Sequence, residues 1–314
     1  MEIIKGLTSL PIDSGASSVT VGFFDGVHRG HRAVIERSAE VASARGLEPV
    51  AVTFDRHPRE VLTPGKEPPL LTTFQRKASL IERLGVSRLV VLEFDQGFAA
   101  WPAEDFVRRV LMASLHAEHV VVGSNFTFGH QALGNLPMLS DLGGAWGFTV
   151  EGVALLKLAG RSVSSSSIRE ALAAGDLGWP TQALGRRFVV DGLVTKGAGR
   201  GASLGFPTAN LEVDPRMLIP ARGVYAGRAF AHDTVHAAAI NVGINPTFGG
   251  DPLHVEAYLL GFDGDLAGEA MAVEFWERLR EEVTFESPDA LAAQIAADVE
   301  RTQAVVGQAQ PQLG

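Results

Sequence analysis

Two histidines three residues apart stand in the glycine-rich run Val21–His31, where an apolar β-rich segment gives way to a helix-like one. Side chains three apart on a helix share a face, so His28 and His31 should project together from its first turn. Glycines let the backbone approach phosphate oxygens, and a helix N-terminus offers N–H donors and a positive dipole. Such a pair suits hydrogen bonding to a triphosphate and stabilisation of a leaving pyrophosphate. The run therefore predicts a nucleotide site.

The same run has two other interpretations. A glycine turn with two solvent-exposed histidines needs no ligand, and a histidine pair also binds metal ions. The run matches neither G-x-G-x-x-G nor G-x-x-x-x-G-K-[ST], so a nicotinamide site and a P-loop both lose support.

A second polar group follows the glycine-rich stretch Lys196–Gly201, which is suited to wrap phosphates through main-chain N–H groups. Thr208 and Asn210 lie two residues apart, which places their side chains on one side of an extended segment. Two neutral oxygens together with ATP phosphates suit Mg²⁺, which keeps several waters and rarely has an all-protein cage. A tight turn with a polar tip explains the same residues without a ligand.

The first half of the chain alternates β-rich runs with helix-like segments, which indicates a parallel sheet covered on both faces. Strands are expected at Ser18–Phe24, Pro49–Phe54, Arg88–Phe94, Glu118–Gly123 and Phe148–Leu156. Helices are expected at Gly30–Arg45, Phe74–Leu84, Ala103–Leu115, Asn135–Trp146 and Ser164–Ala174. Ligands of open α/β sheets bind beyond the carboxyl ends of the strands, which is where Val21–His31 lies.

The pattern changes after Trp179-Pro180, and we place a domain boundary near residue 184, giving domains 1–183 and 184–314. Successive β-rich runs without intervening helices predict an antiparallel barrel or sandwich. These strands are expected at Phe188–Thr195, Gly223–Phe230, Val235–Val242, Leu253–Leu260 and Ala270–Glu277. A final amphipathic helix is expected at Ser287–Val305.

The composition narrows the classes of function. The 314 residues carry a formal net charge of −9 and no cysteine, which leaves no disulfide, thiolate metal site or cysteine nucleophile. An acidic balance argues against a general nucleic-acid binder, which needs a basic face. The sequence shows neither a signal segment nor an apolar run of the roughly 18 residues that a membrane helix needs. We therefore expect a cytoplasmic protein that binds neither nucleic acid nor membranes.

Four segments of the first half match the motifs of one family in order. Thr53–Pro58 resembles T-F-D-x-H-P, Gly123–Gly129 resembles G-x-[DN]-F-x-F-G, and Ser164–Arg169 resembles S-S-T-x-I-R with Ser166 in place of the usual threonine. The flavin-type nucleotidyltransferase signature G-x-F-D-G-x-H-x-G-H is matched by Gly22, Phe24, Asp25, Gly26, His28, Gly30 and His31. The chain resembles the bacterial bifunctional riboflavin kinase/FMN adenylyltransferase family, also called FAD synthetase.

The second half continues the resemblance. Pro207–Asn210 matches the riboflavin kinase motif P-T-A-N, and Gly223–Ala226 and Asn241–Phe248 match the G-V-Y and N-x-G-x-x-P-T-F segments. Val255-Glu256-Ala257 resembles the step whose glutamate is the catalytic base. Glu274 is the competing carboxylate, but it lies on a β-run with apolar neighbours and is expected to face solvent.

The resemblance implies a Rossmann-like nucleotidyltransferase domain with a parallel sheet, followed by an antiparallel β-barrel riboflavin kinase domain that ends in a helix. It implies phosphorylation of riboflavin to FMN and adenylylation of FMN to FAD, with ATP as co-substrate and Mg²⁺ as cofactor. The implied catalytic residues are Glu256, His28, His31 and Arg169, and the implied metal ligands are Thr208 and Asn210.

The resemblance also implies binding residues for both substrates. The implied nucleotide- and phosphate-binding residues are Gly22, Phe24, Asp25, Gly26, Gly30, Arg161, Ser164, Ser165, Ser166, Gly197, Gly199 and Arg200. The implied flavin-binding residues are Phe54, His57, Pro58, Asn125, Phe126, Phe128 and Arg278.

Two alternative functions stay open at this stage. One is a monofunctional riboflavin kinase whose N-terminal domain only binds nucleotide, or the reverse. The other is a flavin-binding carrier that uses the same pockets without turnover. The substrates are small molecules in each case, and the sequence leaves open whether the chain forms a homo-oligomer.

Overall fold

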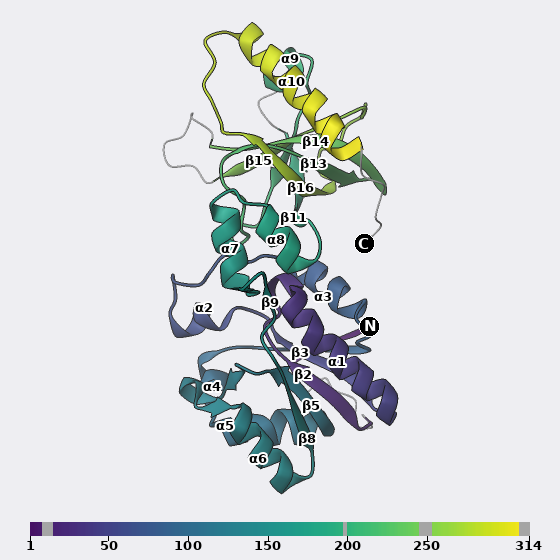
Figure 1. Cartoon of the computed structure of the whole chain (residues 1–314), viewed down its shortest axis with the longest axis vertical. Coiled ribbons are helices and arrows are strands. Elements are labelled where there is room, and N and C mark those ends of the chain that lie inside the picture. The colour runs from purple at the N-terminus through teal and green to yellow at the C-terminus, as the bar shows by residue number, and fades with distance from the viewer. Residues whose placement is uncertain (8–14, 197–199, 245–252, 308–314) are drawn as a thin grey trace. The chain divides into compact units, whose positions relative to one another are not determined.

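The computed structural model describes residues 1–7, 15–196, 200–244 and 253–307. The chain forms two compact units (Figure 1). The first comprises Met1–Pro68 and Phe74–Ser164, and the second comprises Pro69–Thr73 and Ser165–Gly314. The domain boundary near residue 184 stays a prediction.

The first unit is built on a six-stranded parallel sheet with the strand order β1-β4-β3-β2-β5-β8, which confirms the predicted parallel sheet. Its strands are β1 (Glu2–Lys5), β4 (Arg88–Leu92), β3 (Glu48–Phe54), β2 (Ser17–Val21), β5 (Ala117–Gly123) and β8 (Thr149–Val153). Strand β2 is buried along its whole length, as a central strand covered on both faces must be. Strand β1 is an addition to the prediction, because four residues at a sheet edge carry little β-type pattern.

Helices and short elements surround this sheet. They are η2 (Asp25–Val27), α1 (Arg29–Arg45), α2 (Pro58–Leu62), α3 (Phe74–Glu82), α4 (Gln96–Ala99), α5 (Ala103–Phe106), the π-helix η3 (Val107–Ser114), β6 (Thr127–Phe128), η4 (His130–Ala132), β7 (Gly134–Asn135), α6 (Leu136–Trp146), β9 (Lys157–Leu158) and β10 (Arg161–Ser162). The helix expected at 103–115 therefore starts as an α-helix and continues as a π-helix.

Side chains of the sheet alternate between two cores. Val50 and Val52 of β3 pack in one core together with Leu111 of η3. Ala51, between them, faces the other core with Ile35 of α1 and, from α3, Ile81. Both faces of the sheet are therefore covered mainly by apolar groups, but Ser18 and Thr20 of β2 and Thr53 of β3 are buried polar residues within the strands.

The strand order reverses between β2 and β5. From β2 the chain proceeds through β3 and β4 in one direction, and β5 then pairs with the free side of β2. The loops after two such strands diverge and leave a crevice, the usual ligand position in open α/β sheets. The loop after β2 is the Val21–His31 run, and the loop after β5 holds Asn125.

The second unit contains a closed antiparallel barrel with the strand order β11-β12-β15-β14-β13-β16. The strands are β11 (Phe188–Thr195), β12 (Ala209–Glu212), β15 (His254–Leu259), β14 (Thr234–Gly243), β13 (Gly223–Ala231) and β16 (Ala270–Arg280). The helices of this unit are α7 (Ser165–Ala173), α8 (Gly178–Leu184), α9 (Arg200–Ser203) and α10 (Pro288–Gly307). Of the two predicted architectures, barrel and sandwich, the structure has the barrel. The predicted final helix is present as α10.

Helix α8 was not predicted, because Trp179-Pro180 reads as a break in the sequence pattern. A proline in the first turn of a helix has no N–H that the helix needs, so α8 accommodates Pro180. Among the described residues, no helix is long and apolar enough to cross a membrane.

Two adjacent glycines of α6 test how this helix packs against the first unit. A Cβ at Gly143 would lie 2.6 Å from the Phe148 carbonyl oxygen, whereas a Cβ at Gly144 meets no atom within 4 Å. Gly143→Ala should therefore destabilise the first unit by about 1–3 kcal/mol through overpacking. Gly144→Ala should stabilise it by up to about 1 kcal/mol, because alanine is the better helix former. Scanning calorimetry of both variants checks the opposite signs, and equal shifts in the unfolding midpoint would contradict the packing.

Candidate active sites

The turn after β2 holds two non-glycine residues in the left-handed backbone region. Phe24 has φ 55° and Val27 has φ 39°, with Gly26 at φ 79° between them. Each such L-residue costs of order 1–3 kcal/mol, and this strain persists only where the surroundings enforce it. Gly22 leaves room for the Phe24 ring, since a Cβ there would lie 2.7 Å from it. A backbone forced into this form at a strand end is a typical ligand-binding feature.

The two predicted histidines lie at the start of α1. His28 is the N-cap residue, and its Nδ1 accepts a hydrogen bond from the His31 N–H at 3.2 Å, which places the proton of the neutral ring on Nε2. The two rings stack with centroids 3.6 Å apart, and the Phe24 ring meets His31 edge-on at 5.4 Å. The predicted side-by-side projection of His28 and His31 is therefore present. Gly30 keeps the approach open, because a Cβ there would lie 3.2 Å from the His28 ring.

Lys77 of α3 is a buried cation near this turn that the sequence analysis did not single out. Its Nζ donates to the Phe23 carbonyl oxygen at 3.1 Å and to Thr53 Oγ1 at 3.2 Å. Burial lowers the pKa of Lys77 to about 8, and the charge of Asp25 opposes that shift. The sequence does contain a signal for this burial. Lys77 lies three residues after Phe74 and four before Ile81, a spacing that places it on the apolar face of the helix.

The predicted flavin residues of the first unit lie beyond β3 and β5. His57 caps α2 through its Nδ1, and its ring meets the Phe23 ring at 4.9 Å. Phe54 belongs to an aromatic group with Phe94 at 5.4 Å. Pro58, half-buried, is the first residue of α2.

In the loop after β5, Asn125 is exposed, while Phe126 stacks on Phe128 at 5.5 Å. Phe128 is buried beneath Gly134, where a Cβ would come within 2.7 Å of its ring. Asn125 is thus open to solvent, whereas Phe128 forms the support below Phe126. The flavin roles of all these residues stay predictions.

The predicted phosphate residues 161–169 span the two units. Arg161 lies in β10, and the nearby Val163 carbonyl would be 3.8 Å from a Cβ at Gly30, so this segment of the first unit reaches the start of α1. Ser165 and Ser166 open α7 in the second unit, and Arg169 Nε of the same helix donates to the Pro69 carbonyl at 2.7 Å. Ser164 ends the first unit. A joint role of these residues with the histidines stays a prediction.

The second unit contains a cavity of about 620 Å³ on the outer face of its barrel. In β15, Val255, Ala257 and Leu259 are buried in the barrel, so the alternating residues face outward into this cavity. They are His254, Glu256 and Tyr258. In the strand registers, Glu256 lies opposite Asn210 of β12 on one side and Asn241 of β14 on the other, so three strands contribute to one polar group.

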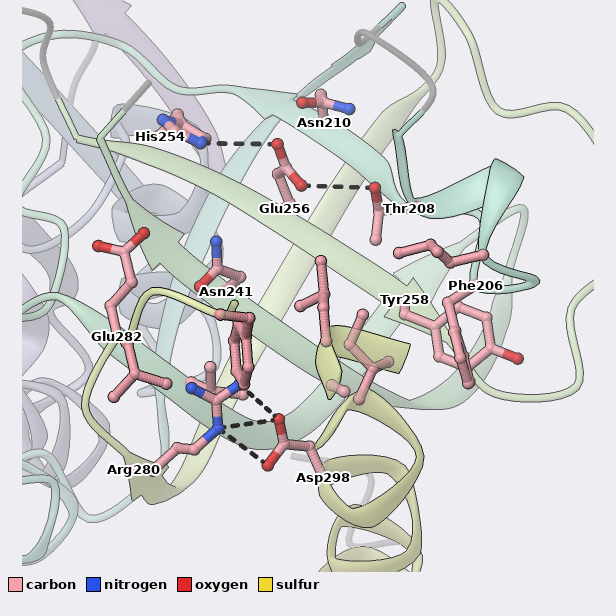
Figure 2. A pocket seen from close by; sticks show the side chains of 18 of the residues that line it. Phe206, Thr208, Asn210, Asn241, His254, Glu256, Tyr258, Arg280, Glu282 and Asp298 are labelled. Carbon is pink, nitrogen blue, oxygen red and sulfur yellow. Dashed lines mark hydrogen bonds and ion pairs between the residues drawn. The ribbon is translucent and has the colours of Figure 1, made fainter. Parts of the chain in front are cut away.

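Glu256 is the centre of the polar end of the cavity (Figure 2). Its Oε2 lies 3.5 Å from Thr208 Oγ1, and its Oε1 lies 3.5 Å from His254 Nε2. Glu274 of β16, the competing carboxylate, does not line the cavity and instead accepts a hydrogen bond from Trp276 Nε1 at 2.5 Å. Of the two carboxylates that the sequence analysis compared, Glu256 is the one that lines the cavity.

The other end of the cavity is apolar and is held by an ion pair. Arg280 donates to both carboxylate oxygens of Asp298 at distances of 2.8–3.2 Å, and Gln294 Nε2 adds a bond to Asp298 at 3.1 Å (Figure 2). This pair ties α10 to the end of β16. Apolar side chains of the cavity lining include Leu204, Phe206, Val224, Ala239, Ile244, Val283, Phe285, Leu291 and Ile295. The cavity thus combines the polar group around Glu256 with an extensive apolar lining.

The polar end fits a divalent cation held jointly with a substrate. Thr208 and Asn210 present oxygen donors to the cavity beside the Glu256 carboxylate, and oxygen is the donor that Mg²⁺ prefers. Across the described ranges there is no cluster of three or more His, Cys, Asp or Glu residues that could hold a metal by itself. A cation bound here would need phosphate oxygens to complete its coordination.

Some predicted residues lie elsewhere or outside the described part of the chain. Gly197 and Gly199 fall outside the described residues, and Arg200 begins α9. Arg278 does not line the cavity; its Nη2 donates to the Arg222 carbonyl at 2.6 Å. The cavity also contains His254 and Asp298, which sequence reasoning missed. Asn241 and Arg280 line it too; both lie in segments that resemble the family's motifs, but neither was given a site role.

The Arg280–Asp298 pair should stabilise the second unit. The Asp298 side chain is 7% exposed, so Asp298→Asn leaves a largely buried guanidinium without its counter-charge, at a cost of about 3 kcal/mol. Glu300→Gln removes the same charge from an exposed position of the same helix and should change stability by less than about 0.5 kcal/mol. Calorimetric unfolding of both variants checks this difference. Equal midpoints would mean that the pair does not hold α10 in place.

Comparison with known proteins gives matches in both halves of the chain. The family model described as FAD synthetase matches residues 11–167, and the model described as riboflavin kinase matches residues 184–306. A relative from Pseudomonas fluorescens, named bifunctional riboflavin kinase/FMN adenylyltransferase, is 37% identical over 306 residues, covering 97% of this chain and 98% of its own. A relative of the same name from Listeria monocytogenes is 35% identical over 288 residues, covering 91% of each chain.

A solved structure from Streptococcus pneumoniae is also similar. It superimposes with a TM-score of 0.87 at 29% sequence identity, covering 96% of this chain and 99% of that chain. Its title names it a macrolide-efflux protein.

Proposed function

The chain belongs to the bifunctional riboflavin kinase/FMN adenylyltransferase family, and from that premise we propose that it makes FAD from riboflavin in two ATP-dependent steps. The second unit phosphorylates riboflavin to FMN. The first unit adenylylates FMN to FAD and releases pyrophosphate. The observation that carries the proposal is the barrel cavity, where Glu256 and Thr208 lie at a polar end opposite an apolar end.

In the kinase step, Glu256 is the general base. The riboflavin ring occupies the apolar end of the cavity, which directs the ribityl chain toward Glu256. The carboxylate accepts the proton of the ribityl 5′-hydroxyl while the 5′-oxygen forms a bond to the γ-phosphorus of ATP. The bond between the γ-phosphorus and the β-phosphate oxygen breaks, and ADP leaves. His254 Nε2, 3.5 Å from Glu256 Oε1, helps to keep the carboxylate directed into the cavity.

Thr208 and Asn210 would hold Mg²⁺ together with the ATP phosphates. When bound, the cation neutralises charge on the transferring phosphoryl group. Two neutral ligands suit this role, because the phosphates themselves supply the remaining oxygens and the negative charge. The fit of the oxygen donors beside Glu256 supports this assignment.

In the adenylylation step, no general base is needed, because the FMN phosphate is already a nucleophile. One of its oxygens bonds to the α-phosphorus of ATP, and the bond between the α-phosphorus and the β-phosphate oxygen breaks. His28 and His31 stabilise the charge that develops on the departing pyrophosphate. Their stacked arrangement at the positive end of α1 supports this role.

The cytoplasm, where ATP is plentiful, is the compartment that we propose for this chain. Its substrates are small molecules.

Replacing the proposed base separates an enzyme from a carrier. Glu256→Gln should lower the kcat of riboflavin phosphorylation by about 10²–10⁴-fold, the contribution of a general base, while riboflavin still binds. Adenylylation of added FMN should continue, because it takes place in the other unit. The matched control Glu274→Gln should keep both activities, since Glu274 lies away from the cavity. Unchanged phosphorylation in Glu256→Gln, measured by flavin chromatography, would rule out this base.

The histidine pair gives the converse test. His31→Asn should lower FMN adenylylation by about 10²–10³-fold, because one donor to the leaving pyrophosphate is removed. Riboflavin phosphorylation by the same chain is the internal control and should be retained. Chromatography of the flavins together with release of pyrophosphate measures both rates. Adenylylation at the wild-type rate would exclude His31 from the reaction.

A further inference from the structure

A buried ammonium group lies directly behind the strained turn of the first unit. Lys77 Nζ donates to the Phe23 carbonyl oxygen at 3.1 Å and to Thr53 Oγ1 at 3.2 Å, and Thr53 Oγ1 donates to the same carbonyl at 3.1 Å. The Lys77 residue is 5% exposed, and Thr53 has no exposed surface. Groups from α3 and β3 therefore converge on one carbonyl oxygen at the entrance of the turn.

The side chain of Phe23 is held by the same cation. Lys77 Nζ lies 4.4 Å from the centroid of the Phe23 ring, a distance at which an ammonium is attracted to the ring face. The His57 ring meets Phe23 edge-on at 4.9 Å. Both the main chain and the side chain of Phe23 are thus fixed, and the next residue is Phe24 with its φ of 55°.

Packing alone does not require a lysine at this position. Lysine is almost never fully buried without a partner, and a methionine would fill a similar volume without the cost of desolvating a charge. The turn itself supplies an opposite charge in Asp25, which is 3% exposed. Burial lowers the pKa of Lys77 to about 8 while Asp25 opposes the shift, so the amine is predominantly charged at neutral pH.

We propose that Lys77 is a positioning residue for the adenylyltransferase reaction, which holds the Phe23–Val27 turn in its strained form so that His28 and His31 meet the triphosphate in a fixed arrangement. The inference rests on the function proposed for the first unit. His28 follows Val27 directly and caps α1, so relaxation of the turn to ordinary φ values would displace the cap and the stacked pair together. Lys77 does not need to touch ATP to have this effect.

The test compares two rates in one chain. Lys77→Met removes the donor and the charge, and the ratio of FMN adenylylation to riboflavin phosphorylation should fall about 100-fold, the cost of a misplaced catalytic group. The loss should fall mainly on kcat, with the KM values for ATP and FMN changed less, because substrate contacts are kept. Lys77→Arg keeps a charged donor and should restore a large part of the rate. A residue that only stabilises the fold would change the unfolding midpoint and leave the kcat of the folded enzyme unaltered.

The control is Lys66→Met, which removes the same charge from an exposed position of the same unit and should leave the ratio unchanged. A Lys77→Met ratio within about threefold of the wild type would overturn the inference, because no positioning effect would then exist. A wild-type chain that phosphorylates riboflavin but never adenylylates FMN would instead remove the proposed function of the first unit, and this inference with it.

A milder variant covers the case in which Lys77→Met does not fold. Thr53→Val removes one acceptor of the amine and one donor to the Phe23 carbonyl, but it leaves the cation in place. We expect it to lower the ratio about tenfold, since one of three converging hydrogen bonds remains. A wild-type ratio in Thr53→Val would contradict the proposed network.

Discussion

The constraint on which both units depend is that the interior of a sheet or barrel must be filled with apolar side chains. In the barrel, Val255, Ala257 and Leu259 fill the inside, so the alternating residues of β15 are forced outward. Polar groups gather there on the outer face, and α10 packs against the strands β13, β14 and β16 of the same barrel. The Arg280–Asp298 pair holds that helix, which is why an ion pair stands beside an apolar lining.

The parallel sheet meets the same constraint in another way. Because β2 and its neighbours are covered on both faces, a ligand can reach the sheet only at the ends of the strands. The strand order reverses between β2 and β5, and the loops that follow them carry the histidine pair and Asn125. The strained turn after β2 costs free energy, which Lys77 and Thr53 offset through the Phe23 carbonyl.

The sequence was sufficient for the features that depend on local pattern. Valine-rich runs separated by amphipathic helices predicted the parallel sheet, and Gly22 to His31 predicted the histidine pair, because motif and spacing are local. The position of Lys77 relative to Phe23 could not be predicted, since it depends on how α3 packs against β3. His254 and Asn241 were missed for a related reason: their place beside Glu256 follows from strand register, which the sequence does not state. Arg278 was predicted from the resemblance alone, whereas Arg280, two residues further along β16, is the arginine that lines the cavity.

The most direct test of the account is a time course of flavins formed by the purified wild-type chain from riboflavin, ATP and Mg²⁺, followed by chromatography. The account predicts that FMN appears first and FAD follows, and that FAD also forms when FMN is supplied in place of riboflavin. Accumulation of FMN without FAD would contradict the assignment of the first unit. Riboflavin that stays bound and unconverted would contradict the whole account and favour a carrier.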